Sequence, residues 1–230
     1  MFRLLDASKT YRHKQSDVIA LRPTTLEISR GEFVAVIGPS GSGKTTLLSM
    51  LGAMLAPSAG KVWLEGNSLY DASATQRAQV RYQKIGFVFQ TFNLIPYLSA
   101  IENVQVPLML AGALTDEQQQ RSMALLTRVG LDCRLDHKPS QLSVGQQQRV
   151  ALARTLVNDP AVILADEPTG NLDPESREMV LGFFEQLCAE GRTVVMVTHD
   201  TAAAERAGRT IRLVSGGVVA DSKRRGHEAA

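Results

Sequence analysis

The sequence predicts an α/β fold on three observations. Short runs rich in β-branched residues recur along the chain, and several are apolar without alternation, as in strands that a parallel sheet buries on both faces. Segments with helical periodicity lie between the later runs. Of the 230 residues, 44% are hydrophobic and 21% are charged, which is typical of a chain that buries a core and atypical of a disordered one.

The apolar runs predict the strands Glu32–Ile37, Lys61–Leu64, Ile85–Phe89, Val162–Ala165, Thr193–Thr198 and Thr210–Val214. A capping box at Thr115–Gln118 predicts the start of a helix that Gly130 ends. An apolar stripe within Pro174–Ala189 predicts another helix, which stops before Gly191. Residues 92–140 carry little strand pattern, and we interpret them as a helical lobe inserted into the α/β core.

Charge and cysteine content narrow the class of protein. Lys and Arg number 25 and Asp and Glu number 23, so a net charge of +2 gives no electrostatic reason to expect nucleic-acid binding. Cys133 and Cys188 match no metal-binding spacing, and we expect a reducing compartment. Residues 1–15 lack the apolar centre of a signal peptide, and no run approaches the roughly 18 apolar residues of a membrane helix. We therefore expect that the chain does not span a membrane by itself.

A glycine-rich segment joins the strand that ends at Ile37 to an apolar helical run. It fits the pattern G-x-x-x-x-G-K-[ST] and, with the next residue, comprises Gly38, Pro39, Ser40, Gly41, Ser42, Gly43, Lys44, Thr45 and Thr46. The glycines let backbone N–H groups surround a phosphate, and the helix N-terminus adds its positive dipole end. Lys44 would contact the β- and γ-phosphates, and the Thr45 hydroxyl would face Mg²⁺. A glycine-rich turn without a ligand is the alternative, but the flanking strand and helix are the context that a phosphate-binding loop requires.

Two carboxylates end a second apolar run, at residues 161–167. Ligands of open α/β sheets collect at the carboxyl ends of the strands, so Asp166 is placed to hold Mg²⁺ and Glu167 to polarise a water molecule. An aspartate on the metal beside such a glutamate favours hydrolysis over transfer to a second substrate. Together with the phosphate loop, this pair predicts a Mg²⁺-dependent nucleoside triphosphatase.

Between these motifs, residues 142–146 read Leu-Ser-Val-Gly-Gln and lead into a helical run. With this segment the chain resembles the ATP-binding cassette (ABC) ATPases over nearly its full length. The resemblance implies a P-loop NTPase core with a mostly parallel sheet, an N-terminal antiparallel β portion and an inserted α-helical signature subdomain. It implies one domain, with a RecA-like core at about 1–91 and 159–222, a helical subdomain at about 92–158 and a tail at 223–230.

The resemblance also implies roles for single residues. Tyr11 falls where these ATPases stack an aromatic ring on adenine, and Gln90 matches the glutamine that contacts Mg²⁺ and the attacking water. His199 matches the histidine that contacts the γ-phosphate, Glu167 becomes the general base, and Asp173 lies in the loop that crosses between protomers. Taken singly, Tyr11, Gln90 and His199 each have an ordinary structural alternative. Their order around the phosphate loop favours the functional interpretation.

The signature segment departs from the usual LSGGQ because Val144 replaces the first glycine. The resemblance implies that Ser143 and the backbone N–H of Gly145 reach the γ-phosphate bound to the opposite protomer, with Gln146 part of the same motif. It therefore implies a head-to-tail dimer, expected to be a homodimer, that encloses two ATP molecules. A β-branched residue restricts the local backbone, so Val144 puts the geometry of this shared site or its turnover rate in question.

Residues 85–103 and 165–173 look most like one branch of the family, which contains lipoprotein-releasing, macrolide-export and FtsE-type ATPases. This likeness implies a separate integral-membrane permease as partner and a position at the cytoplasmic face of the inner or plasma membrane. Residues 92–101 would form the groove that receives a helix of the permease. The alternative is that they pack the core of the helical lobe itself. The alternatives are an importer ATPase for amino acids or another small solute, a membrane-free ABC protein of DNA repair or translation, and a regulator that does not hydrolyse. The short spacing from Gln90 to Leu142 disfavours the repair type, and Glu167 disfavours the regulator.

Overall fold

The structure is a computed structural model, and it describes residues 1–12, 16–110, 112 and 114–223. Its strands are β1 (Phe2–Tyr11), β2 (Val18–Ile28), β3 (Phe33–Ile37), β4 (Ala59–Leu64), β5 (Asn67–Ser68), β6 (Ile85–Phe89), β7 (Val162–Asp166), β8 (Thr193–Thr198), β9 (Arg209–Val214) and β10 (Gly217–Lys223). They form a six-stranded sheet of order β10-β9-β3-β8-β7-β6 and a four-stranded sheet of order β2-β1-β4-β5. The larger sheet is parallel apart from β10, and the smaller one is antiparallel. The α/β prediction is confirmed.

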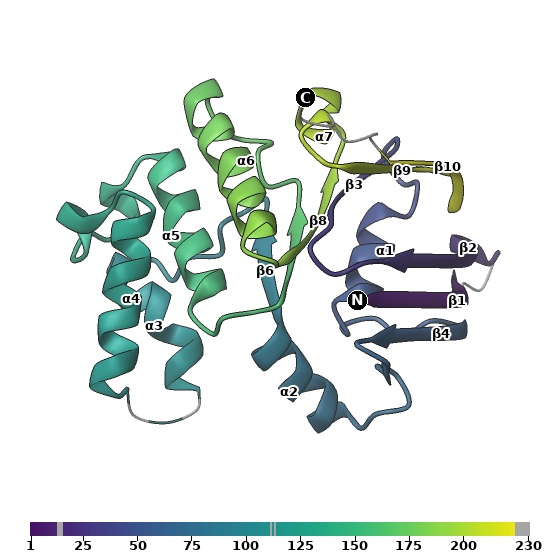
Figure 1. Cartoon of the computed structure of the whole chain (residues 1–230), viewed down its shortest axis with the longest axis horizontal. Helices are drawn as coiled ribbons and strands as arrows, with labels where there is room; N and C mark the ends of the chain where they lie inside the picture. The colour runs from purple at the N-terminus through teal and green to yellow at the C-terminus, as the bar shows by residue number, and fades with distance from the viewer. Residues whose placement is uncertain (13–15, 111, 113, 224–230) are drawn as a thin grey trace, which may run out of the picture.

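The helices are α1 (Lys44–Leu51), α2 (Ala74–Lys84), α3 (Ala100–Met109), α4 (Asp116–Arg128), α5 (Val144–Leu156), α6 (Pro174–Ala189) and α7 (Thr201–Glu205), with 3-10 turns η1 (Asp132–Arg134) and η2 (Pro139–Gln141). The predicted capping box is present, since the Thr115 side chain accepts a hydrogen bond from the Gln118 N–H at 3.2 Å. Figure 1 shows α3, α4 and α5 gathered on the side of the molecule away from the antiparallel sheet. These helices follow β6 and precede β7, but the domain boundaries given above stay predictions.

The central strands β3, β7 and β8 of the six-stranded sheet are buried on both faces, whereas the edge strand β10 is largely exposed. Along β8, Val194 and Met196 belong to a core shared with α5 and α6, whereas Val195 and Val197 belong to a core shared with α1 and the antiparallel sheet. All six residues of β8 are buried. This two-sided burial explains why the predicted strands are apolar without alternation.

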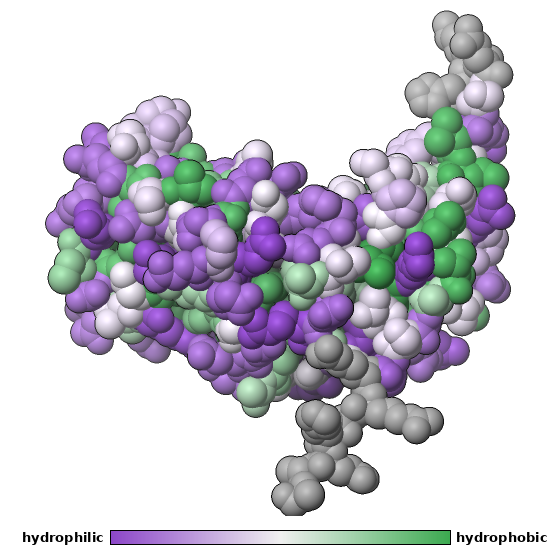
Figure 2. All heavy atoms as spheres, turned by 90° about the horizontal axis from the view of Figure 1, so that it is seen from above, coloured by the Kyte–Doolittle hydropathy of each residue, from purple (hydrophilic) through white to green (hydrophobic). Residues whose placement is uncertain are grey.

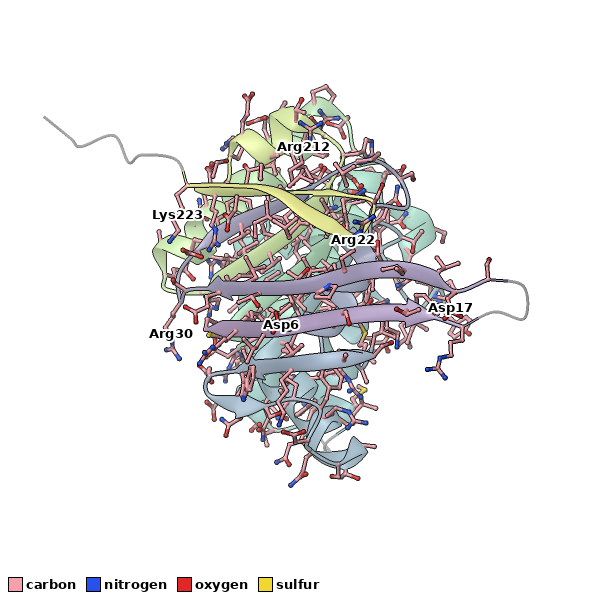
Figure 3. The ribbon with its side chains drawn as sticks, turned by 90° about the vertical axis from the view of Figure 1, so that its right-hand side faces the viewer. Asp6, Asp17, Arg22, Arg30, Arg212 and Lys223 are labelled. Carbon is pink, nitrogen blue, oxygen red and sulfur yellow. The ribbon has the colours of Figure 1, made fainter. Side chains whose placement is uncertain are left out.

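The two sheets meet where β2 passes the β9–β10 turn (Figure 3). The Arg22 N–H donates to the Gly216 carbonyl at 2.7 Å, and Arg22 Nε donates to the Ser215 carbonyl at 3.0 Å. The Gly216 N–H in turn donates to the carbonyl of Ser42 at 3.1 Å. These bonds hold the glycine-rich loop against both sheets.

The sequence indicated neither α2 nor β10. Every described residue of α2 is exposed or half-buried, so the sequence of this helix lacks the apolar stripe that would predict it. The strand β10 lies at the sheet edge, and its last residue, Lys223, ion-pairs with Glu32 at 3.0 Å although the sequence placed it in a tail. Residues 224–230 of that predicted tail lie outside the described residues.

Candidate active site

The carboxyl ends of β3, β6, β7 and β8 meet at one edge of the sheet, at the top of Figure 1. The glycine-rich loop follows β3, Gln90 follows β6, Glu167 follows β7 and His199 follows β8. Figure 2 looks down on this end of the molecule, where hydrophilic side chains cover most of the surface. The parallel sheet therefore collects polar groups from segments far apart in the chain.

At two of the loop glycines, neighbouring strands leave no space for a side chain. Gly38 has φ +154°, and a Cβ on it would lie 2.1 Å from the carbonyl oxygen of Leu213 in β9. Gly43 has φ +98°, and its Cβ would lie 2.2 Å from the carbonyl oxygen of Ala20 in β2. No side chain fits at either position, so the backbones of β9 and β2 press directly on the loop.

The loop is built to receive an anion. Lys44 Nζ is largely buried and donates to the carbonyls of Gly38 at 2.8 Å and Pro39 at 3.1 Å. Ser42 Oγ is buried and has no hydrogen-bond partner among the described residues. The N-cap of α1 is Gly43, which has no side chain to satisfy the first N–H groups of the helix. A buried ammonium, an unpaired hydroxyl and free N–H groups together fit a phosphate.

Oxygen ligands for a divalent cation lie beside the loop. Thr45 Oγ1 is 3.5 Å from Asp166 Oδ1, at the end of β7. Burial, followed by the adjacent Glu167 charge, raises the pKa of Asp166, while Thr45 and Lys44 partly oppose the shift. No group of three or more His, Cys, Asp or Glu side chains is arranged as a metal site within the described part of the chain. A cation with one or two protein ligands and substrate phosphates as the others, such as Mg²⁺, fits this donor set.

Glu167 and His199 form a pair at the same edge. The φ of +47° at Glu167 turns the chain out of β7, while the Glu167 N–H still donates to the Val197 carbonyl of β8 at 2.9 Å. Glu167 Oε2 lies 2.9 Å from His199 Nδ1 and 3.4 Å from the His199 backbone nitrogen. The carboxylate is therefore held by the residue that follows β8, with one oxygen left for another partner.

Gln90 lies next to the turn that follows Glu167. A Cβ placed on Gly170, in the turn after Glu167, would lie 3.2 Å from Gln90 Nε2. Beyond Gln90, the carbonyls of Phe92 and Asn93 each accept a hydrogen bond of 2.6 Å from the Arg154 guanidinium of α5. This role of Arg154 was not predictable from the sequence, because nothing in its local pattern shows which distant loop it faces.

These groups line a cleft of about 570 Å³. Of the predicted site residues it contains Tyr11, Ser40, Gly41, Ser42, Gly43, Lys44, Thr45, Thr46, Gln90, Asp166, Glu167 and His199. Gly38 and Pro39 lie behind it and supply carbonyls to Lys44. Val18, Ile19 and Ala20 also line the cleft but were not predicted. Tyr11 pairs with Val18 across β1 and β2, which creates an exposed apolar wall at this end.

Four predicted residues lie outside the cleft of their own chain. Ser143 caps α5 in a reciprocal box with Gln146, and Gly145 lies in the first turn of that helix. Asp173 caps α6 by accepting a hydrogen bond from the Ser176 N–H at 2.9 Å. Both helices begin at the top of Figure 1. Val144 is 48% exposed at the first position of α5.

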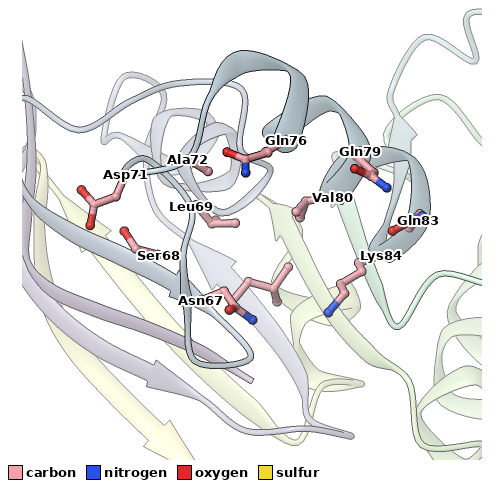
Figure 4. A pocket seen from close by; sticks show the side chains of 11 residues that line it. Asn67, Ser68, Leu69, Asp71, Ala72, Gln76, Gln79, Val80, Gln83 and Lys84 are labelled. Carbon is pink, nitrogen blue, oxygen red and sulfur yellow. The ribbon is translucent and has the colours of Figure 1, made fainter.

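A second cavity, of about 650 Å³, lies between α2 and the β4–β5 hairpin (Figure 4). Its charged side chains have partners, since Lys84 pairs with Glu65 at 2.6 Å and Asp71 with Lys61 at 3.0 Å. The remaining polar lining consists mainly of side-chain amides. We therefore assign the chemistry to the first cleft.

Comparison with known proteins agrees with this geometry. Residues 21–170 match the family described as ABC transporter. The chain belongs to this family. It is 49% identical over 96% of its length to a macrolide export ATP-binding/permease protein MacB from Syntrophobacter fumaroxidans, but covers 32% of that protein. It is 48% identical to an uncharacterized ABC transporter ATP-binding protein from Thermotoga maritima, over 94% of this chain and 92% of the relative.

A solved structure of the ATP-binding cassette MJ0796, a dimer in a post-hydrolysis state bound to ADP and Pi, has the same fold. The TM-score is 0.90 at 42% sequence identity, and the match covers 98% of this chain and 100% of that one. The present chain spans about a third of the length of the MacB relatives that it matches.

Over the described residues, none of the helices combines the length and apolarity that crossing a membrane would take.

Proposed function

We propose that the chain binds ATP with Mg²⁺ in the cleft and hydrolyses it. The observation that supports this most directly is Glu167, held by His199 beside Asp166 and within the same cleft as the phosphate loop. A kinase would need a second substrate site at this position, whereas a carboxylate with a free oxygen can accept a proton from water. The described ADP and Pi complex of MJ0796 supports the same reaction.

Each group in the cleft has a role in this proposal. The loop N–H groups and Lys44 bind the phosphates, and Tyr11 stacks on adenine beside the apolar wall of β2. Thr45, Asp166 and Gln90 would hold Mg²⁺, which neutralises phosphate charge when bound. Lys44 is held by two loop carbonyls, so nucleotide must compete for its ammonium group.

The hydrolytic step uses the pair at the sheet edge. Glu167 accepts a proton from a water molecule whose oxygen attacks the γ-phosphorus, and the bond to the β–γ bridging oxygen breaks to give ADP and phosphate. Gln90 orients the water. His199 fixes the Glu167 carboxylate from 2.9 Å and contacts the γ-phosphate.

A second copy of the chain completes the site. Ser143, Gly145, Gln146 and Asp173 lie outside the cleft of their own chain, at the starts of α5 and α6. We propose that they contact the ATP of a head-to-tail partner, in a homodimer. The description of MJ0796 as a dimeric cassette supports this arrangement.

We further propose that the dimer drives an integral-membrane permease of the export or mechanotransmission type, from the cytoplasmic face of the membrane. The support is the similarity to MacB proteins, whose name joins an ATP-binding part to a permease. The docking groove would be residues 92–101, where Tyr97 is 74% exposed. Isolation from native membranes in mild detergent tests this, because a permease with many spans and a solute-binding protein would favour the importer instead.

Glu167→Gln tests the catalytic proposal. The amide keeps the shape of the side chain but cannot accept the proton, so turnover should be abolished while ATP still binds and traps a dimer. Phosphate release measures turnover, and size-exclusion chromatography with and without ATP measures the dimer. If Glu167→Gln hydrolyses ATP as fast as the parent chain, Glu167 is not the base.

A further inference from the structure

The first turns of α5 and α6 lie close together at Gly145. Gly145 lies outside the left-handed region, so its backbone would accept any residue. A Cβ on Gly145, however, would lie 2.1 Å from Ser176 Oγ and 2.9 Å from Ser176 Cβ. Rotating the Ser176 side chain would relieve the first contact but not the second, because the backbone fixes the Cβ. The glycine is therefore required by the approach of α6.

Ser176 connects this contact to the turn that begins α6. Its N–H donates to Asp173 Oδ1 at 2.9 Å, and Asp173 Oδ2 lies 3.7 Å from the same Cβ position on Gly145. Gly145 and Asp173 thus both lie against Ser176, and Ser143 caps the helix whose first turn contains Gly145.

The start of α5 is also tied to the loop that follows Glu167. Gln148, one turn further along α5, is fully buried, and its Nε2 donates to the Pro168 carbonyl at 2.8 Å. A displacement of α5 from α6 would therefore move both the first turn of α5 and the loop that follows Glu167 in the same chain.

We propose that Ser176 is a positioning residue, whose contact with Gly145 sets the spacing between the signature turn and the Asp173 turn. This inference rests on the proposed function, in which both turns contact the nucleotide of a second copy. In that proposal Gly145 has two roles: its backbone N–H contacts the nucleotide, and its lack of a Cβ leaves room for Ser176. If the N–H contact were its sole role, residue 176 would not affect the outcome of a substitution at 145.

A double-mutant cycle separates these roles. The variants are Gly145→Ala, Ser176→Gly and the two combined, because Ser176→Gly removes both atoms that the new methyl would meet. Gly182→Ala, in the same helix α6 and with nothing within 4 Å of the added Cβ, is the matched control. Turnover and melting temperature are measured on each chain. ATP-dependent dimer formation is measured with each variant in the Glu167→Gln background.

We expect Gly145→Ala to lower turnover about tenfold or more, since forcing a methyl into a packed contact shifts the backbone. Dimer formation should then need more ATP. Adding Ser176→Gly should restore both readouts to within about twofold of Ser176→Gly alone, as strong coupling between two contacting residues requires. Gly182→Ala should behave like the parent chain.

Two results would overturn the proposal. The first is a double variant as impaired as Gly145→Ala. The second is a Gly145→Ala chain that melts at a lower temperature but dimerises at the same ATP concentration, since Ser176 would then stabilise the fold without positioning the signature. If the parent chain does not hydrolyse ATP, the proposed function fails instead, and the melting temperatures of the cycle still show whether 145 and 176 are coupled.

Discussion

Arg154 gives the sharpest test of how the Gln90 loop is held. Its guanidinium bridges the carbonyls of Phe92 and Asn93, with both hydrogen bonds at 2.6 Å, and burial lowers its pKa. The loop begins directly after Gln90 and carries the proposed permease groove. Arg154→Met keeps most of the side-chain length and packing but removes both donors.

The expected loss follows from the two acceptors. Hydrogen bonds from charged donors contribute about 1.5–3 kcal/mol each when they are shielded from water. Asn93 is exposed, so water can replace its bond, whereas Phe92 is half-buried and loses more. We expect Arg154→Met to lower the free energy of unfolding by about 2 kcal/mol. Arg154→Lys should lose about half of that, because an ammonium group cannot match the planar fork that spans both carbonyls.

Urea unfolding measures the stability change, and phosphate release measures turnover. Turnover of Arg154→Met should fall about tenfold, which corresponds to about 1.4 kcal/mol in the barrier, because Gln90 is no longer held. ATP affinity should change less than turnover, since Arg154 does not line the cleft and acts only through Gln90. Arg212→Met is the control, as Arg212 is exposed on β9. The reasoning is refuted if Arg154→Met and Arg212→Met have the same stability and the same turnover.

Two further predictions concern the metal site and the signature. Burial raises the pKa of Asp166 in the folded chain above that in the unfolded chain. The free energy of unfolding of the metal-free protein therefore falls as the pH rises from the unfolded-state pKa through the raised one. At pH 7 in EDTA, Asp166→Asn should therefore raise the melting temperature, by about 2–4 °C per kcal/mol for a chain of this size, and the order of the two chains should reverse with Mg²⁺ and ATP. A lower melting temperature for Asp166→Asn in EDTA would contradict this. Val144→Gly should raise turnover or leave it unchanged, because the valine is 48% exposed and its main effect is on the backbone. A large loss of turnover would mean that Val144 belongs to a specialised shared site.

Local sequence patterns were sufficient to predict a strand or helix wherever its burial imposes a pattern on consecutive residues. The strands β7 and β8 were predictable because burial on both faces imposes continuous apolar runs, and α6 because one buried face imposes a stripe. By contrast, α2 buries no stripe among its described residues and left no such pattern. The capping box of Ser73 and Gln76 marks its start, but no periodic apolar face marks the rest of the helix.

The candidate site divides in the same way. The phosphate loop, Asp166, Glu167 and the signature were predictable because each is a short motif attached to the end of one strand or the start of one helix. The lining by Val18, Ile19 and Ala20 was not, since it depends on the pairing of β1 with β2 across a turn. The bonds of Arg154 to Phe92 and Asn93 likewise join residues about 60 positions apart.

Residue types and short spacings in the sequence were enough to predict the fold class, the resemblance to ABC ATPases and the candidate phosphate-binding residues. Which of these residues share a cleft depends on how distant segments pack, and that is visible only in the folded chain. The parallel sheet brings Gln90, Glu167 and His199 to one edge and leaves Ser143 and Asp173 at the starts of other helices. The packing of α5 against α6 also explains why residue 145 is a glycine, because a Cβ there would lie 2.1 Å from Ser176 Oγ.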